Sequence, residues 1–192
     1  MFKPNKVSCM LLSAVIGMIM LANHAEAKKM FPLNIAKGEM PGDVSTSCLI
    51  EMTEENIAEG AGLGLKLAFS KTGWAGEFKP RKGNWTGYKY LRFSAFNPTD
   101  RKVTMALGIK DEFSKGGNAE RKTWIAQPYE LKPGMNQVEI TLEGIKAQDG
   151  RVADLKKIKQ WFLSYKFFTE NSWEEKGDDV FTVFISNFRI ED

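Results

Sequence analysis

Residues 90–110 read YLRFSAFNPTDRKVTMALGIK, and both halves of this stretch alternate apolar and polar side chains. In the first half Leu91, Phe93 and Ala95 fall on one side of an extended chain. In the second half every other residue of 103–109 is apolar. The Asn-Pro-Thr-Asp run between the halves is a turn signal. The stretch therefore predicts a hairpin of two half-buried strands.

Further strand signals continue on both sides of this stretch. Short alternating or aromatic-rich segments, bounded by Gly, Pro and Asn, lie at 48–52, 63–69, 123–131, 136–142, 163–168 and 180–190. Segment 154–162 has helical cues instead, because Asp154 suits an N-cap and Leu155, Ile158 and Phe162 fall on one helical face. This order of elements predicts an all-β fold, an antiparallel β-sandwich of the jelly-roll type with one short helix.

The N-terminal segment has the layout of a secretory signal peptide. Two lysines precede an apolar run over 10–22, and the small-residue triplet Ala-Glu-Ala follows at 25–27. A bilayer-spanning helix needs about 20 apolar residues, so a membrane anchor is the weaker alternative. We expect a signal peptide over 1–27, an extended lead-in over 28–45, a single β-sandwich domain over 46–192, and a secreted or periplasmic location without a membrane span after cleavage.

The composition excludes several kinds of catalysis. The predicted mature chain lacks histidine and keeps one cysteine, Cys48, because His24 and Cys9 lie in the signal peptide. A Ser-His-Asp or Cys-His site cannot form without imidazole, and zinc sites normally draw on His or Cys. We interpret Cys48 as a small core residue. The formal net charge of the whole chain is only +3, which argues against a nucleic-acid partner.

Three segments resemble galactose-binding-like β-sandwiches, a family that includes many non-catalytic carbohydrate-binding modules. They are 87–98 (GYKYLRFSAFNP), 129–136 (YELKPGMN) and 181–190 (FTVFISNFRI). The first is similar to the family's Leu-x-Phe strand with its Asn-Pro turn, the second to its Pro-Gly turn, and the third to its closing strand. The resemblance covers most of 49–190, and it implies a sandwich fold and a carbohydrate partner.

The same resemblance raises the question of a structural calcium ion, which many members of the family hold near the closing strand. Here Ser186 precedes Asn187 where the family often has Asp, which weakens that expectation. Calcium takes roughly six to eight oxygen ligands. The candidate metal ligands are Glu51, Asp111 and Asp192, and we expect no other cofactor.

Aromatic residues are the candidate ligand contacts. Four tryptophans lie within two residues of Gly, Asn, Lys or Glu in predicted loops or strand ends, namely Trp74, Trp85, Trp124 and Trp173. A sugar ring stacks its C–H face on an aromatic plane, while its hydroxyls seek planar polar groups. We therefore predict these ligand-binding residues: Trp74, Trp85, Tyr90, Arg92, Arg121, Trp124 and Gln127. The alternative is that the tryptophans cover core edges and that Tyr90 and Arg92 lie on an ordinary solvated face.

The leading hypothesis is an exported, non-catalytic β-sandwich that binds a polysaccharide or oligosaccharide. One alternative is a structural or protein-interaction domain of an extracytoplasmic assembly, bound to another exported protein and to no glycan. The other is a hydrolase or lyase whose carboxylates come from Asp111-Glu112, or from Glu174-Glu175 with Asp178-Asp179. Lysine stands in or near each of these acidic runs, so a solvated charge cluster is the simpler interpretation.

Overall fold

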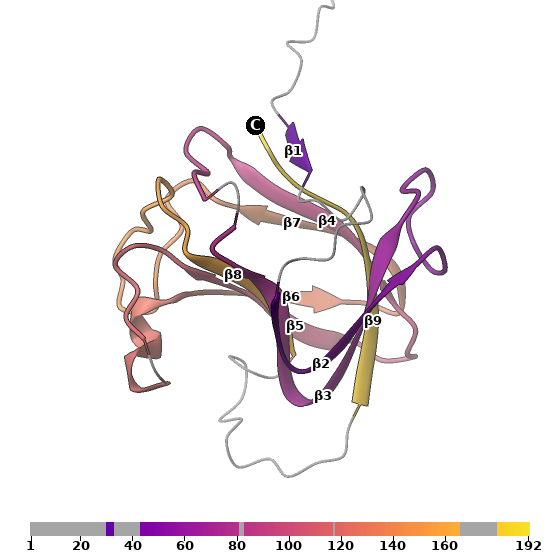
Figure 1. The fold of residues 1–192 in the computed structure, drawn as a ribbon. Helices are drawn as coiled ribbons and strands as arrows, with labels where there is room; N and C mark the ends of the chain where they lie inside the picture. The colour runs from indigo at the N-terminus through magenta and orange to yellow at the C-terminus, as the bar shows by residue number, and fades with distance from the viewer. Residues whose placement is uncertain (1–29, 33–42, 81–82, 117, 166–179) are drawn as a thin grey trace, which may run out of the picture.

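The computed structural model describes residues 30–32, 43–80, 83–116, 118–165 and 180–192 (Figure 1). Its strands are β1 (Met30–Pro32), β2 (Asp43–Thr53), β3 (Gly64–Phe78), β4 (Tyr90–Asn97), β5 (Val103–Lys110), β6 (Ile125–Leu131), β7 (Gly134–Thr141), β8 (Gln160–Tyr165) and β9 (Val180–Glu191), with the 3-10 helix η3 at Asn118–Thr123. The predicted signal peptide, Trp173 and the acidic run at 174–179 lie outside these residues. β1 and the start of β2 fall within the segment predicted as a lead-in.

The strands form two antiparallel sheets that are joined through β3. Strand pairing follows the order β6-β5-β8-β3-β9-β4-β7, while β2 pairs with β3 and β1 with β9. Residues 65–70 of β3 pair with β9, whereas residues 74–78 pair with β8. We call the β6-β5-β8 side, with the second half of β3, the first sheet. The second sheet holds the first half of β3 with β9, β4 and β7. Figure 1 shows β1 beside the C-terminus, as its pairing with β9 requires.

Side chains from both sheets meet in one core. Leu91, Phe93 and Ala95 of β4 are fully buried there, so the inward face predicted for this strand is confirmed. A run of aromatic contacts crosses between the sheets: Trp161 stacks on Phe188, Phe188 on Phe93, and Phe93 meets Tyr129 edge to face. The first and last rings of this run belong to the first sheet and the middle two to the second. The predicted all-β antiparallel sandwich is therefore confirmed.

The predicted hairpin of residues 90–110 is wrong. β4 pairs with β7 and β9, and β5 pairs with β6 and β8, so the chain crosses from one sheet to the other after Asn97. The buried Asn97 side chain satisfies the backbone of this crossing. Its amide donates to the carbonyls of Arg101 (2.8 Å) and Leu131 (3.2 Å), and its oxygen accepts the N–H of Thr99 (3.0 Å). Alternation located both strands, but the partner of each strand depends on contacts distant in sequence.

The predicted helix at 154–162 is also wrong, because the segment is a turn followed by β8. The Asp154 carboxylate accepts the N–H of Lys156 (2.9 Å), which closes a turn. In β8, Trp161 and Leu163 face the core while Phe162 faces out from the sandwich. The helical spacing therefore combined apolar residues from two different faces. Within the described residues no helix is long and apolar enough to cross a membrane, and η3 is the helical element named among them.

Candidate functional site

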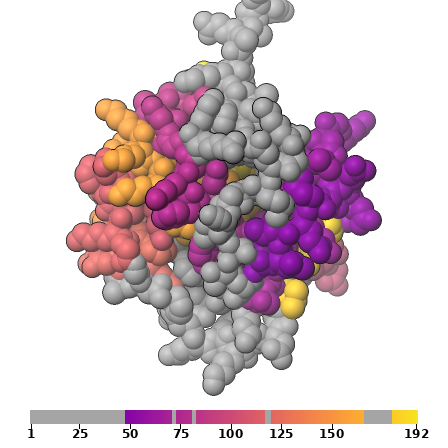
Figure 2. Space-filling model, in the orientation of Figure 1, coloured from indigo at the N-terminus to yellow at the C-terminus, as the bar shows by residue number. Residues whose placement is uncertain are grey.

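An open groove of about 480 Å³ lies where β3 ends and the chain approaches β8. We call it the Phe78 groove. Its lining residues come from two segments distant in sequence: Phe78, Lys79, Pro80, Gly83, Lys156, Lys157, Ile158 and Lys159. Figure 2 shows magenta and orange atoms in contact on the left of the view, so chain near residue 85 and chain near residue 155 share one surface. The groove has the size of a small-molecule or oligomer site.

Backbone hydrogen bonds join the two walls of the Phe78 groove. The N–H of Lys79 donates to the carbonyl of Lys159 (2.8 Å), and the N–H of Ile158 donates to the carbonyl of Gly83 (2.7 Å). Gly83 permits this approach, because a Cβ atom there would lie only 2.7 Å from the Ile158 oxygen. Lys79 has a φ of 52°, which turns the chain out of the ladder at the end of β3. The walls are thus held by main-chain geometry.

Phe78 supplies an exposed aromatic ring at this groove. Its side chain is on the outer side of β3, because Ala75 faces the core and side chains alternate along a strand. The residue is 51% exposed, and the Lys79 ammonium lies 5.5 Å from the ring centroid. Pro80 and Ile158, which are both buried, are the other apolar side chains in its lining. The groove therefore combines an apolar strip with charged edges.

Lysines supply the charge of the Phe78 groove, and none of the described residues that line it is acidic. The Lys157 ammonium pairs with the exposed Glu112 carboxylate (2.5 Å), and the Lys159 ammonium donates to the Glu112 carbonyl (2.9 Å). Across the described part of the chain, neither Lys79 nor Lys156 forms an ion pair. The groove is therefore electropositive.

Two of the tryptophans predicted as ligand platforms are buried, which corrects that prediction. Trp85 is fully enclosed in the main core, and Trp124 is 4% exposed. The chain turns at Arg121, whose carbonyl accepts the backbone N–H of Trp124 (2.8 Å). The Trp124 indole then lies on the outer side of the first sheet. There it meets Phe162 edge to face at 6.3 Å, and half-buried Trp74 meets the same ring at 5.3 Å. These three rings form a second apolar cluster.

The other predicted ligand residues lie on different surfaces. Arg92 and Tyr90 are on the outer side of β4, where the guanidinium lies 4.6 Å from the Tyr90 ring centroid. The same guanidinium pairs with Glu139 and with Glu191, so its hydrogen bonds are directed within the sheet. Arg121 is half-buried in η3, and Gln127 is exposed on β6. The predicted set is thus not one site, and ligand contact by Trp74, Tyr90, Arg92, Arg121 or Gln127 stays a prediction.

The proposed metal ligands do not converge. Glu51 pairs with Lys66 at 2.9 Å, and Asp192 is half-buried at the C-terminus. Over the described ranges, no group of three or more His, Cys, Asp or Glu side chains is placed to hold a metal ion. Glu51, Asp111 and Asp192 are therefore not brought together among the described residues, and calcium binding stays a prediction.

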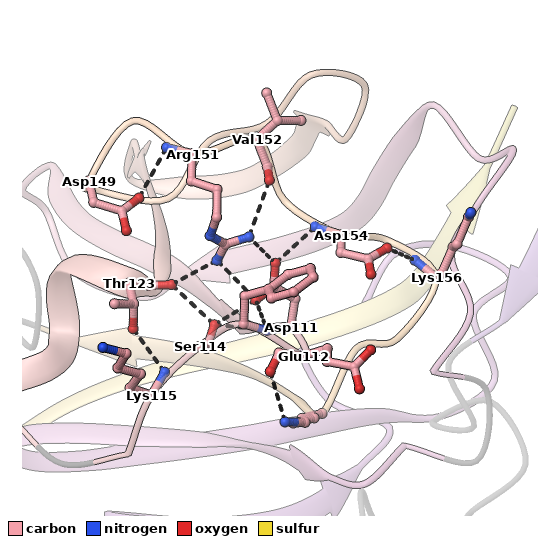
Figure 3. Close-up of polar contacts among 12 residues, drawn as sticks. Asp111, Glu112, Ser114, Lys115, Thr123, Asp149, Arg151, Val152, Asp154 and Lys156 are labelled. Atoms are coloured by element: carbon pink, nitrogen blue, oxygen red, sulfur yellow. Dashed lines mark hydrogen bonds and ion pairs between the residues drawn. The ribbon is translucent and has the colours of Figure 1, made fainter.

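Asp111 has a structural role instead (Figure 3). The fully buried carboxylate accepts hydrogen bonds from both terminal nitrogens of Arg151, from the Ser114 hydroxyl, and from the N–H groups of Phe113 and Asp154. Burial alone would raise its pKa, but the bonds from Arg151, Asp154 and Ser114 outweigh burial and hold the pKa below its ordinary value. With its oxygens occupied and Glu112 paired to Lys157, the Asp111-Glu112 doublet does not form a catalytic pair. The second acidic candidate lies outside the described residues.

Comparison with known proteins identifies the fold. No model of a known protein family matches the chain, and no curated protein matches it in sequence. Among solved structures, the chain is similar to the family 11 carbohydrate-binding module of Clostridium thermocellum, in complex with a β-1,3-1,4-mixed-linked tetrasaccharide. The TM-score is 0.55 at 14% sequence identity, and the match covers 85% of this chain and 94% of that one. A family 30 carbohydrate-binding module gives a TM-score of 0.50 at 14% identity, over 77% and 91% of the two chains.

An agarase is similar as well, with a TM-score of 0.58 at 13% identity, over 85% of this chain but only 24% of the agarase. The chain thus spans about a quarter of that enzyme. The protein has the β-sandwich fold of carbohydrate-binding modules, which confirms the resemblance found in the sequence. At these identities the likeness concerns the fold, because one sandwich hosts many functions.

Proposed function

We propose that the protein is an exported, non-catalytic module that binds glycan in the Phe78 groove. The observation that carries the proposal is an exposed aromatic ring beside an open groove, on a sandwich whose fold is shared with carbohydrate-binding modules. The leader-like segment at 1–27 supports export. The lining residues that the structure describes include no carboxylate, which supports binding rather than hydrolysis.

The Phe78 ring suits the apolar face of a pyranose. Sugar C–H groups pack on an aromatic plane, and the exposed Phe78 ring offers one such plane at the groove. Ammonium groups at Lys79 and Lys156 donate hydrogen bonds to ring hydroxyls from the two walls. Because the walls are joined through backbone bonds, little order would be lost on binding, which favours affinity.

Affinity gel electrophoresis with soluble polysaccharides tests the proposal. We expect retardation of the wild-type protein by at least one polysaccharide, and loss of that retardation in Phe78→Ala. Leu49→Ala is the matched control, because Leu49 is 60% exposed on β2 and does not line the groove. Retardation that survives in Phe78→Ala, or is lost equally in Leu49→Ala, would remove the groove from the proposal.

The protein-interaction alternative makes a different prediction. It requires a specific oligomer or partner complex in size-exclusion chromatography, with no change in migration on any polysaccharide. That combination would replace glycan binding as the function of the sandwich.

A further inference from the structure

We infer that the ligand of the Phe78 groove is a polyanionic polysaccharide, one whose sugar rings carry sulfate or carboxylate groups. The inference rests on the proposed function and specifies the chemical class of the glycan. It follows from the lysines that line the groove and from the lack of acidic side chains among the lining residues in the described part of the chain.

The lysines stand on both walls of the groove. Lys79 follows β3, whereas Lys156, Lys157 and Lys159 precede β8, and the Lys79–Lys159 backbone bond brings the walls together. Among the described residues, the Glu112 carboxylate pairs with one of these four ammonium groups, that of Lys157. The carbonyl that Lys159 contacts is neutral and leaves its charge intact. The groove therefore keeps a net positive charge on a chain whose overall net charge is only +3.

Positive charge continues from the groove along the first sheet. Gln160 of β8 pairs with Lys110 of β5 on one side and with Phe78 of β3 on the other. Lys110 therefore lies in the same cross-strand row as the exposed Phe78 ring. The Lys110 ammonium lies 3.6 Å from the centroid of the Trp124 ring. Its pKa is below its ordinary value because of burial and because of the positive charge of Arg121 nearby. An anionic chain leaving the groove along this row would meet the Lys110 ammonium.

Electrostatics favour an anionic over a neutral occupant. Like charges held in a concave site repel one another, and an anionic ligand relieves that repulsion while being drawn in by the same field. A neutral glycan gains hydrogen bonds from the ammonium groups but leaves their repulsion in place. Lys is also a compact point charge that pairs with sulfate or carboxylate without the fixed fork geometry of Arg. The single exposed ring of Phe78 would stack one sugar while the lysines bind its charged substituents.

The test compares pairs of polymers that share a sugar backbone and differ in charge. Binding of the full-length protein is measured by titration calorimetry with dextran and dextran sulfate, and with methyl-esterified pectin and its de-esterified carboxylate form. We expect binding of at least one charged member to be about tenfold or more tighter than that of its neutral partner. Raising the salt from about 0.1 M to about 1 M should abolish most of the difference, because the Debye length falls to about 3 Å. The sulfate and carboxylate arms tell the two anion sources apart.

Matched charge variants locate the effect. Lys79→Gln with Lys156→Gln should lower affinity for the charged polymer about tenfold. Lys102→Gln with Lys132→Gln removes the same charge from exposed positions outside the groove and should leave affinity unchanged. Equal losses in the two double variants, or binding of a DNA oligonucleotide as tight as that of the charged glycan, would show nonspecific polyanion attraction and overturn the inference.

The outcomes for the two proposals are distinguishable. If neutral and charged polymers bind equally and Phe78→Ala abolishes both, the charge inference fails while glycan binding stands. If neither kind of polymer binds at low salt, glycan binding itself fails.

Discussion

Asp111 and Arg151 form a two-point ion pair inside the loops at one end of the sandwich, with Nη1–Oδ2 and Nη2–Oδ1 distances of 2.5 and 3.0 Å. The Asp111 carboxylate is fully buried, whereas the Arg151 side chain is 28% exposed. Arg151 also donates to the carbonyl of Thr123 (3.1 Å), so one guanidinium holds together the loop after β5, the end of η3 and the connection between β7 and β8. This pair therefore joins three segments that lie outside the named strands.

Removing one partner of this pair should destabilise the fold, and the two partners should differ. Arg151→Met leaves a buried carboxylate without its cation and should lower the free energy of unfolding by about 3 to 5 kcal/mol. Asp111→Asn should cost less, because Arg151 retains access to water. Urea denaturation measures both. Glu51→Gln, which breaks the exposed pair with Lys66, should cost less than about 1 kcal/mol. An Arg151→Met loss as small as this control would contradict a structural role for the pair.

The Asp111 pair should also make stability depend on pH. The pKa of Asp111 in the folded protein lies below that of the unfolded chain, which is about 3.9. The stabilisation is therefore complete above about pH 4 and is lost as the pH falls through the lower folded-state pKa. Asp111→Asn should remove this part of the acid sensitivity. Urea midpoints recorded at descending pH would converge for the two proteins, and parallel curves would disprove the assignment.

Trp85 should matter for stability, since its indole is sealed in the core and its backbone N–H donates to the Leu155 carbonyl (2.8 Å). Trp85→Ala should lower the free energy of unfolding by about 3 to 5 kcal/mol. Trp74→Ala, at a half-buried ring, should cost clearly less. Thermal denaturation followed by circular dichroism compares the variants. A folded Trp85→Ala protein of wild-type stability that no longer binds glycan would restore the platform interpretation.

Gly76 should not tolerate a side chain. A Cβ atom there would lie far inside van der Waals contact with the Trp161 carbonyl and the Phe162 backbone, which strand pairing holds in place. Gly76→Ala should cost about 1 to 3 kcal/mol or more in unfolding free energy. Gly116→Ala is the control, because nothing lies within 4 Å of the Cβ position there. Equal urea midpoints for the two variants would show that β3 and β8 can separate at this point without cost.

Cys48 should react slowly in the native protein. Burial raises the pKa of its thiol to about 12, so the thiolate that attacks alkylating reagents is scarce at neutral pH. Iodoacetamide labelling of Cys48, quantified by mass spectrometry of its peptide, should be far slower in buffer than in urea. Labelling at the same rate in both would contradict the position of Cys48 against the core.

Period-two alternation is sufficient to locate several strands from this sequence. The segment predicted at 103–110 coincides with β5, and the closing segment predicted at 180–190 coincides with β9 to within a residue. Pairing was not predictable from the same pattern, because β4 and β5 belong to different sheets although a turn signal separates them. The false helix arose because Phe162 packs outside the main core, a position that local sequence does not reveal.

The candidate site was largely hidden from sequence reasoning. Extending the alternation of β3 past residue 70 through Trp74, Gly76 and Phe78 would have placed Phe78 on the outer face, so this one signal was present. The backbone contact between Lys79 and Lys159 was not predictable, because the chain passes through strands of both sheets before it returns to β8. The prediction that tryptophans near polar residues are exposed failed for Trp85 and Trp124 for a related reason. Polar neighbours in sequence do not prevent burial when the ring folds back onto a sheet.

The first half of β3 belongs to one sheet and its second half to the other. If one sheet lost its strand pairing, half of β3 would be released, and β3 also holds the other sheet. Unfolding should therefore be cooperative, with both sheets lost in one transition. The Phe78 groove sits at the end of this shared strand. An occupant of the groove would therefore raise the melting temperature of a sheet that it never touches.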